Sequence, residues 1–372
     1  MLNVFEVAQT VVSHIQKHYA EDVALIAYYG SYAQGTATSR SDLDFFFIPA
    51  TERGYQASIQ FVIDDISFDF WPISWERAER MAKFEEQNTT IIADCNLLYV
   101  RSEEDRERFL KLREWIAELP QQQGLTFIEK AEAQLRDVYV HLYKMSRLAE
   151  GDFAACRTEA HGVLNKTVYS LALLNRTYMT RGWGKNREQL RQFAVRPVRL
   201  EQLAETILSA GSIKEIREAC ERLTEDMVTL LTEQRPAHKG APSFPDRAKG
   251  FYEEIKGIFD KIITACEKND YMLASYWAIG VQDEAAAFLY YFECGLWPDR
   301  LEIGAAYQSF YHEAGLPDLI PLLNPRDLVP LHDAVVRLDQ LLERHLQERG
   351  VRMNRFEGVA QFEGFLEARV RA

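Results

Sequence analysis

Residues 28–49 read YYGSYAQGTATSRSDLDFFFIP and place Asp42 and Asp44 at the start of an apolar strand. On an extended strand, residues i and i+2 face the same way, about 6–7 Å apart at Cα. Two ionised carboxylates on one side repel each other, and burial adds a desolvation cost. The pair therefore needs a positive partner, and a divalent cation such as Mg²⁺ suits it when phosphates supply further oxygen ligands.

The segment before the two aspartates is suited to bind a phosphate. VALIAYYG at 23–30 is a β-branched and aromatic run, which predicts a strand followed by a turn. Gly30 allows the backbone to approach a phosphate closely, and Ser31 adds a hydroxyl and N–H groups. With Asp42 and Asp44, these residues predict a metal–triphosphate site.

A third carboxylate is expected from ISFDFWPI at 66–73. Its two phenylalanines share one face of the predicted strand, and Asp69 lies on the other. If this strand pairs beside the strand of the first two aspartates, Asp69 joins them and can orient or deprotonate a hydroxyl, or bind metal. Asp64 and Asp65 compete for this role, but they lie at a predicted hairpin turn, where aspartate is common.

The chain is predicted to be an α+β protein with three domains. A mixed α/β domain is expected over 1–118, a helical bundle over 119–236, and a second helical domain over 250–372. The proline- and glycine-rich stretch 235–250 is interpreted as a linker. The predicted strands are 23–29, 43–49, 59–64, 66–73 and 96–100, and the predicted helices of the bundle are 125–150, 155–181, 186–194, 200–209 and 213–234.

Composition narrows the class of protein. The chain has 372 residues, 47% of them hydrophobic, and a net charge of −13. No apolar run reaches the ~18 residues that span a bilayer, and the N-terminus does not resemble a signal peptide, so we expect a cytoplasmic protein with no membrane partner. The acidic balance argues against nucleic acid and suits a cationic small molecule or metal, although it also serves solubility. Five scattered cysteines without CxxC spacing indicate neither a disulfide framework nor a zinc site.

The run GSYAQGTATSRSDLDFF at 30–46 contains Gly-Ser, a ten-residue gap and Asp-x-Asp. It resembles the signature of the polymerase-β-like nucleotidyltransferase superfamily, and within it the sequence is most similar to kanamycin-type antibiotic nucleotidyltransferases and to minimal nucleotidyltransferases. A solvated edge strand could also carry Asp-x-Asp, but the full spacing favours the resemblance. It implies that Asp42 and Asp44 bind Mg²⁺, that Ser31 contacts nucleotide phosphates, and that Asp69 supplies the third acidic group.

In kanamycin-type enzymes, a glutamate of the helical bundle acts as the base and a nearby lysine binds phosphate. By this resemblance, the best candidates here are Glu159 and Lys166 within 157–185. Seven residues apart, they fall on one helix face, although the family pair is closer in sequence and both could be ordinary solvated charges. Gly182 is predicted to end this helix. The rival candidates are Asp137, Lys144 and His161.

The sequence therefore predicts a Mg²⁺-dependent nucleotidyltransferase that transfers AMP from ATP to a hydroxyl of a small cationic acceptor, such as an aminoglycoside. One alternative is a protein-adenylylating enzyme of the minimal type, and another is a nucleotide-binding regulator without turnover. Arg157 and His161 have three residues between them instead of four, which excludes the ribonuclease motif of toxins that partner minimal nucleotidyltransferases. Residues 250–372 would cover the cleft or form a homodimer.

Overall fold

The computed structural model describes residues 2–38, 41–122, 124–149, 151–180, 186–235, 242–298, 301 and 305–370. The chain divides into two compact units, Met1–Arg235 and Pro236–Ala372. Each unit has its own hydrophobic core.

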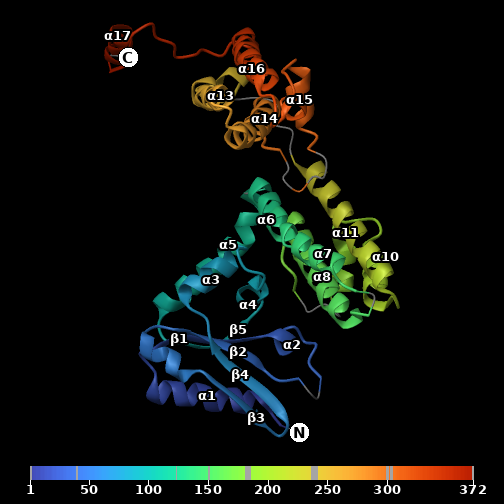
Figure 1. The fold of residues 1–372 in the computed structure, drawn as a ribbon. Coiled ribbons are helices and arrows are strands. Elements are labelled where there is room, and N and C mark those ends of the chain that lie inside the picture. The colour runs from blue at the N-terminus through green and yellow to red at the C-terminus, as the bar shows by residue number, and fades with distance from the viewer. Residues whose placement is uncertain are drawn as a thin grey trace. The chain divides into compact units, whose positions relative to one another are not determined.

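The first unit is built on a five-stranded mixed sheet with the strand order β3-β4-β2-β1-β5 (Figure 1). The strands β2 and β4 are parallel neighbours, and the other neighbouring pairs are antiparallel. The observed strands confirm the predicted α+β class with only small changes at their ends; they are β1 (Val23–Tyr29), β2 (Asp44–Pro49), β3 (Ile59–Ile63), β4 (Ile66–Pro72) and β5 (Asn96–Val100).

Helices cover both faces of this sheet. On one face, α1 (Val4–His18) packs its apolar stripe against strand side chains that include Phe45 and Phe70. The opposite face carries Phe46, which joins a core formed mostly with residues of the sheet and of three later helices. Those helices are α3 (Trp75–Ala82), α4 (Thr89–Ala93) and α5 (Glu103–Gln122). Because side chains alternate along a strand, Asp44 projects on the same side as Phe46, toward the α3–α5 face.

The hairpin between β3 and β4 has the predicted tight turn. Asp64 and Asp65 have φ of 49° and 61°, so both occupy the left-handed region that a two-residue turn between twisted strands requires. The turn sets the register of the hairpin, in which Ile63 pairs with Ile66 and Gln60 pairs with Asp69.

The remaining helices of the first unit form the predicted bundle. They are α6 (Gly124–Arg136), α7 (Val138–Ser146), α8 (Phe153–Leu174), α9 (Arg187–Gln192), α10 (Leu200–Ser209) and α11 (Ile213–Gln234). The single helix predicted over 125–150 is two helices, α6 and α7, which meet at Asp137. The domain boundary predicted at 118–119 falls inside α5, which continues through Pro120.

The helix predicted over 155–181 is shorter than expected. The helix α8 ends at Leu174, and Arg176 has φ of 54°, a left-handed conformation that stops the helical path. The Asn175 side chain donates to the carbonyl of Leu171 and so occupies an acceptor at the helix end. The predicted C-terminal residue Gly182 lies outside the described residues.

The second unit is helical in its described part. Its core is formed by three long helices, α13 (Phe251–Glu267), α14 (Tyr271–Cys294) and α16 (Val329–Glu348). Shorter elements are α12 (Phe244–Arg247), α15 (Gln308–Glu313), a 3₁₀ turn (Ile320–Leu322) and α17 (Val359–Val370). The part of the predicted linker at 236–241 lies outside the described residues.

Two further expectations concern the whole chain. Among the helices that the structure describes, none is both long and apolar enough to cross a bilayer.

No described cysteine forms a disulfide, and four of the five are buried, as expected for small hydrophobic side chains; these are Cys95, Cys156, Cys220 and Cys266.

Candidate functional site

The strand register gathers the three aspartates on the α3–α5 face of the sheet. Phe45 of β2 lies opposite Phe70 of β4 in a parallel pair, and the rings are 5.1 Å apart on the α1 side. The residues immediately before this pair are Asp44 and Asp69, so both project to the other face. Asp42 precedes Asp44 by two residues and lies close enough to affect its ionisation. The prediction that the Asp69 strand pairs beside the Asp42–Asp44 strand is confirmed.

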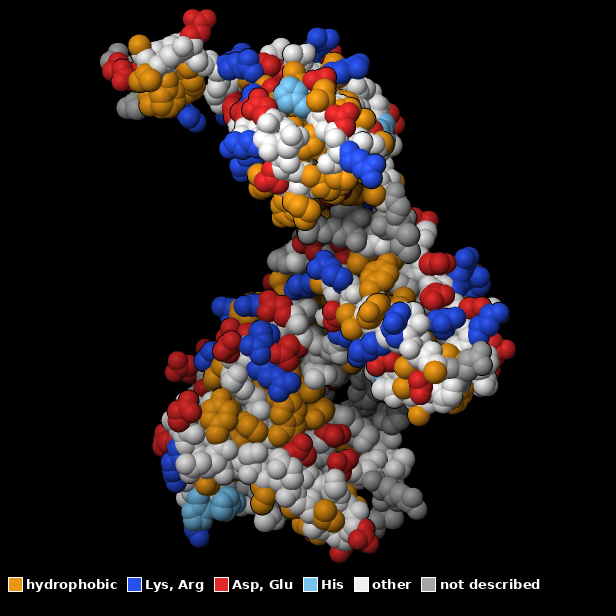
Figure 2. Space-filling view, in the orientation of Figure 1, with side chains coloured by type: hydrophobic (Ala, Val, Ile, Leu, Met, Phe, Trp, Pro, Cys, Tyr) orange, Lys and Arg blue, Asp and Glu red, His pale blue; other side chains and the backbone are white. Residues whose placement is uncertain are grey.

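This cluster carries negative charge without a cationic partner among the described side chains. Burial raises the pKa of Asp44 from 3.8 to about 6, and repulsion from Asp42 and Asp69 adds to the shift. No described Lys, Arg or His forms an ion pair with any of the three carboxylates. Figure 2 shows acidic side chains gathered on the surface over β2 and β4, beside a hydrophobic patch. The site therefore favours a ligand that brings positive charge.

Gly30 begins α2 (Gly30–Ala33), directly after β1, and its backbone lies against the Asp44 carboxylate. Its φ of 72° is in the left-handed region. A Cβ atom at this position would lie 2.0 Å from Oδ2 of Asp44, well inside van der Waals contact. Glycine is favoured here, because the left-handed conformation disfavours a side chain and the Asp44 carboxylate would have to move to admit one.

Ser31 follows in the same helical turn, and backbone hydrogen bonds hold its loop. The N–H of Gln34 donates to the carbonyl of Gly30 at 3.1 Å, and the N–H of Thr36 donates to the carbonyl of Ser31 at 2.8 Å. The Gln34 side chain donates to the carbonyl of Thr180, which follows α8. The Gly30–Ser31 turn is thus joined to the helical bundle through one side chain.

Three residues that contact this site were not predicted from the sequence. Tyr29 pairs with Asp44 across β1 and β2, and its hydroxyl accepts a 3.3 Å hydrogen bond from the Trp71 indole. Burial raises the pKa of Tyr29 to about 12, and the nearby aspartates add to the shift. The Gln60 amide donates to Asp69 at 2.7 Å. Gln60 could have been found, because the two-residue turn at 64–65 pairs position 60 with 69.

The carboxylates of Asp42 and Asp44 fit a divalent cation whose remaining ligands are water and the phosphates of a bound substrate. Among the described residues, no group of three or more His, Cys, Asp or Glu side chains forms a ready metal site. Mg²⁺, however, is usually bound by one or two carboxylates, with water and substrate phosphates completing its shell. Asp42 and Asp44 match that requirement, as does the close approach at Gly30. Asp69 as a third metal ligand stays a prediction.

The two residues predicted in the bundle lie in separate ion pairs. Glu159 of α8 accepts from Nδ1 of His141 at 2.7 Å and from Nζ of Lys144 at 3.3 Å, both on α7. Lys166 pairs with Asp137 at 2.5 Å. The His141 hydrogen bond is the main cause that lowers the pKa of Glu159. Two of the rival candidates, Lys144 and Asp137, are thus the ion-pair partners of Glu159 and Lys166. The catalytic role of Glu159 and the phosphate-binding role of Lys166 stay predictions.

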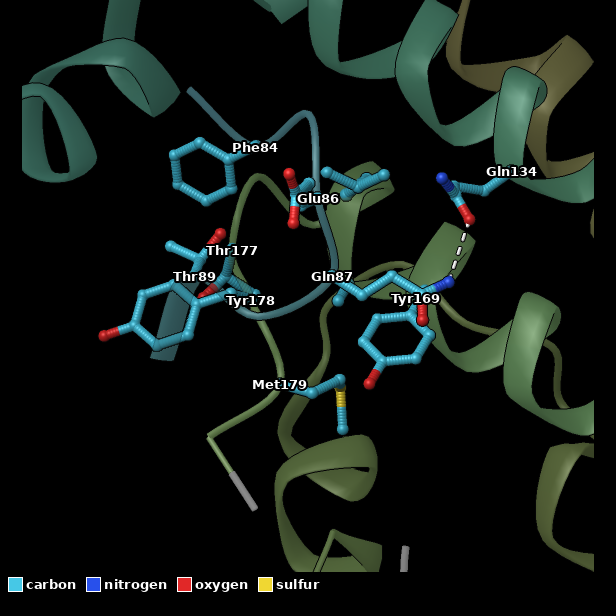
Figure 3. Close-up of a pocket in the computed structure, with 11 residues that line it drawn as sticks. Phe84, Glu86, Gln87, Thr89, Gln134, Tyr169, Thr177, Tyr178 and Met179 are labelled. Carbon is cyan, nitrogen blue, oxygen red and sulfur yellow. Dashed lines mark hydrogen bonds between the residues drawn. The ribbon is translucent and has the colours of Figure 1, made fainter. Parts of the chain in front are cut away.

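A pocket that is open to solvent lies in the first unit between the α3–α4 connection and the bundle (Figure 3); the space between its walls, with the solvent at its open side included, is about 310 Å³. Residues from α6, α8 and the segment after α8 complete its wall. Figure 3 shows the Gln87 side chain extending to Gln134, with the Tyr169 ring beside them. The lining residues are Phe84, Glu86, Gln87, Thr89, Gln134, Tyr169, Ala172, Leu173, Thr177, Tyr178 and Met179.

Comparison with known proteins identifies two regions of the chain. Residues 10–148 match the model of the nucleotidyltransferase domain, and residues 106–236 match that of the KNTase C-terminal domain. No curated protein sequence gives a significant match. Among solved structures, the chain resembles a nucleotidyltransferase-like protein from Exiguobacterium sibiricum, with 10% identity and a TM-score of 0.36, over 67% of this chain and 80% of that one.

The two family matches overlap and together run from residue 10 to residue 236. The first contains the Gly30–Ser31 turn and all three clustered aspartates, and the second contains α6–α8 and the pocket wall that follows them. The chain therefore belongs to the polymerase-β-like nucleotidyltransferase superfamily and is a nucleotidyltransferase enzyme.

Proposed function

We propose that the protein transfers a nucleoside monophosphate, AMP from ATP, to a hydroxyl group of a small-molecule acceptor. The observation that carries this proposal is the contact between the Gly30 backbone and the Asp44 carboxylate, with Asp42 and Asp69 beside it. This arrangement supports a triphosphate site at Gly30, beside carboxylates that form no ion pair with a described cationic side chain.

In the proposed reaction, the acceptor oxygen attacks the α-phosphorus of ATP. The new O–P bond forms as the bond from the α-phosphorus to the bridging oxygen breaks, and pyrophosphate leaves with that electron pair. Ser31 and the Gly30 amide would bind phosphate oxygens and hold the chain in line. Asp69 would take the proton of the acceptor hydroxyl.

Asp42 and Asp44 would hold Mg²⁺ in this site. The ion would neutralise negative charge on the triphosphate as pyrophosphate forms. Removal of divalent ions with EDTA is expected to abolish pyrophosphate release, and added Mg²⁺ is expected to restore it. Full turnover in EDTA would contradict the metal assignment.

Labelled ATP incubated with Mg²⁺ and a panel of hydroxyl compounds tests the function. Pyrophosphate release that requires a small acceptor, together with a labelled acceptor product, would support the proposal. Release that requires a protein partner would instead favour protein adenylylation. ATP binding without release under any condition would favour a regulator without turnover.

The acceptor was expected from the sequence to be cationic, such as an aminoglycoside. The net charge of −13 and the match to the KNTase C-terminal domain agree with that expectation. The charge, however, is a property of the whole chain, and the chemistry of the pocket wall bears on the acceptor more directly.

The two candidate bases can be separated by substitution. We expect Asp69→Asn to lower kcat by about 10²-fold, the usual contribution of a positioned general base, with little change in KM. Glu159→Gln is expected to have the smaller effect, because Glu159 already binds His141 and Lys144. Steady-state kinetics on both variants measure this, and a larger loss at Glu159 would assign the base to α8.

A further inference from the structure

We infer that the pocket of Figure 3 is the acceptor site and that it selects a neutral hydroxyl compound with an aromatic ring, not a polycation. This inference rests on the proposed function, because it names the acceptor of the same reaction. It depends on the side chains that line the pocket, on how their charges are paired, and on the contacts that join the pocket to the Gly30–Ser31 turn.

The pocket contains a single acidic side chain, and that charge is already paired. Glu86 accepts from Nε of Arg77 and from Nε of Arg80, each at 3.0 Å. The two guanidinium groups help to hold the pKa of Glu86 below its usual range. A polyamine bound here would find no unpaired carboxylate among the lining residues. The one carboxylate, that of Glu86, is bound by two arginines, which would repel the positive charges of the polyamine. The pocket is therefore unsuited to an aminoglycoside.

The remaining wall is aromatic and apolar. Phe84 is buried, and its ring packs edge-on against Phe127 at 4.9 Å, which fixes its position. Tyr169 and Tyr178 add two further rings, and Leu173 contributes an aliphatic surface. A wall of this kind favours a ligand with an aromatic ring, because ring–ring contacts stabilise it beyond the burial of area.

The polar groups in the pocket are mostly neutral. The Gln87 amide donates to Oε1 of Gln134 at 3.1 Å, which leaves an oxygen of Gln87 and an amide N–H of Gln134 for a ligand. Burial alone raises the pKa of Tyr169, and no hydrogen bond to a described residue contributes, so its hydroxyl is also available. These groups can fix the orientation of a neutral ligand through hydrogen bonds.

Two chains of contacts join the pocket to the nucleotide site. Met179 in the wall precedes Thr180, whose carbonyl accepts from the Gln34 side chain, three residues after Ser31. On the other side, the Arg77 guanidinium that binds Glu86 stacks 5.4 Å from the Trp71 ring.

The backbone of the pocket wall is held in an unusual conformation. Phe84 and Arg176 have φ of 58° and 54°, which bulky residues rarely adopt. Arg176 directly precedes the wall residues 177–179, and Phe84 begins the opposite side. Such conformations persist where surrounding contacts enforce them, and they are concentrated at ligand sites.

The test measures binding first, without nucleotide, on the full chain. Neutral phenyl- and naphthyl-substituted alcohols are expected to raise Tm and to bind in calorimetry, while aminoglycosides are not. Gln87→Trp, which fills the pocket from its half-buried edge, is expected to weaken alcohol binding at least tenfold. Gln134→Trp fills the same space from α6 and serves if the first variant does not fold. Gln121→Trp, on the exposed surface of α5, is the matched control and should bind as the wild type does.

Pyrophosphate release with ATP and Mg²⁺ then separates the two proposals. Release stimulated by aryl alcohols and lost in Gln87→Trp would support both. Alcohol binding that Gln87→Trp abolishes, without any release, would keep the pocket as a ligand site and overturn the proposed reaction. Release with aminoglycosides, unchanged in Gln87→Trp, would keep the reaction and overturn this assignment. Alcohols that bind neither the wild type nor the control would also overturn it.

Discussion

Replacing Asp44 by asparagine is expected to lower nucleotidyl transfer by about 10³-fold, because the amide removes a charge that would hold the metal against the triphosphate. The same change should stabilise the metal-free protein. Burial and the charges of Asp42 and Asp69 raise the pKa of Asp44 from 3.8 to about 6, so ionisation opposes folding. We expect a gain of about 1 kcal/mol in the free energy of unfolding, reduced from the full shift because solvent screens a partly exposed group.

The contribution of Asp44 to the free energy of unfolding decreases as the pH rises. The folded state holds the Asp44 proton more tightly than the unfolded state does, so the stability from this group is complete below about pH 4. It is lost as the pH rises through about 6. Asp44→Asn should therefore lack this loss, and the stability gap between variant and wild type should open between pH 4 and 6. Thermal melts in EDTA across this range, with pyrophosphate assays at pH 8, measure both effects.

Asp64→Asn is the matched control for this experiment. It makes the same chemical change at an exposed turn residue, where asparagine also tolerates a φ of 49°. Its activity and its pH profile of stability should follow the wild type. If Asp44→Asn retained activity, or if both variants changed alike, the assignment of Asp44 would fail.

Gly30→Ala is the second change with a large expected effect. A methyl group would lie 2.0 Å from Oδ2 of Asp44, so the carboxylate or the turn must move. We expect activity to fall at least about 10²-fold, because small displacements of catalytic groups are costly. The overlap should also destabilise the fold by about 1–3 kcal/mol, in addition to the cost of the backbone conformation.

Gly35→Ala separates the two causes. Gly35 has φ of 66°, close to the 72° of Gly30, but a Cβ there would meet no atom within 4 Å. Both variants carry the cost of a left-handed alanine, about 1–2 kcal/mol, and only Gly30→Ala adds the collision. Denaturant unfolding and kcat measured on both variants give the difference. Equal losses in the two would show that backbone strain, and not contact with Asp44, decides the role of Gly30.

Much of the structure of residues 1–118 was predictable, because the sequence patterns that indicate its strands and turns are local. Short runs of β-branched and aromatic residues located all five strands, and the aspartates at 64–65 located a turn whose register also pairs Gln60 with Asp69. The i, i+2 spacing placed Asp42 and Asp44 on one side of a strand. These inferences need only the chain within a few residues of each position.

The bundle was harder to interpret because its candidate residues depend on neighbours that are distant in sequence. Glu159 and Lys166 share one helix face by spacing, but each is paired with α7 or with the junction before it, through His141, Lys144 and Asp137. No periodicity within α8 specifies which charge on another helix will lie opposite. The early end of α8 depended similarly on Arg176, whose left-handed conformation has no marker in sequence.

By itself, the sequence determined the strands, the Gly-Ser and Asp-x-Asp elements and the superfamily they indicate, because β-branched and aromatic runs and motif spacing are properties of short segments. Only the tertiary structure decided that β2 pairs in parallel with β4, that Gly30 contacts Asp44, and that residues 84–89 and 177–179 enclose one pocket. These contacts join segments up to about ninety positions apart, and the packing of the sheet and helices around shared cores, not local preference, brings them together.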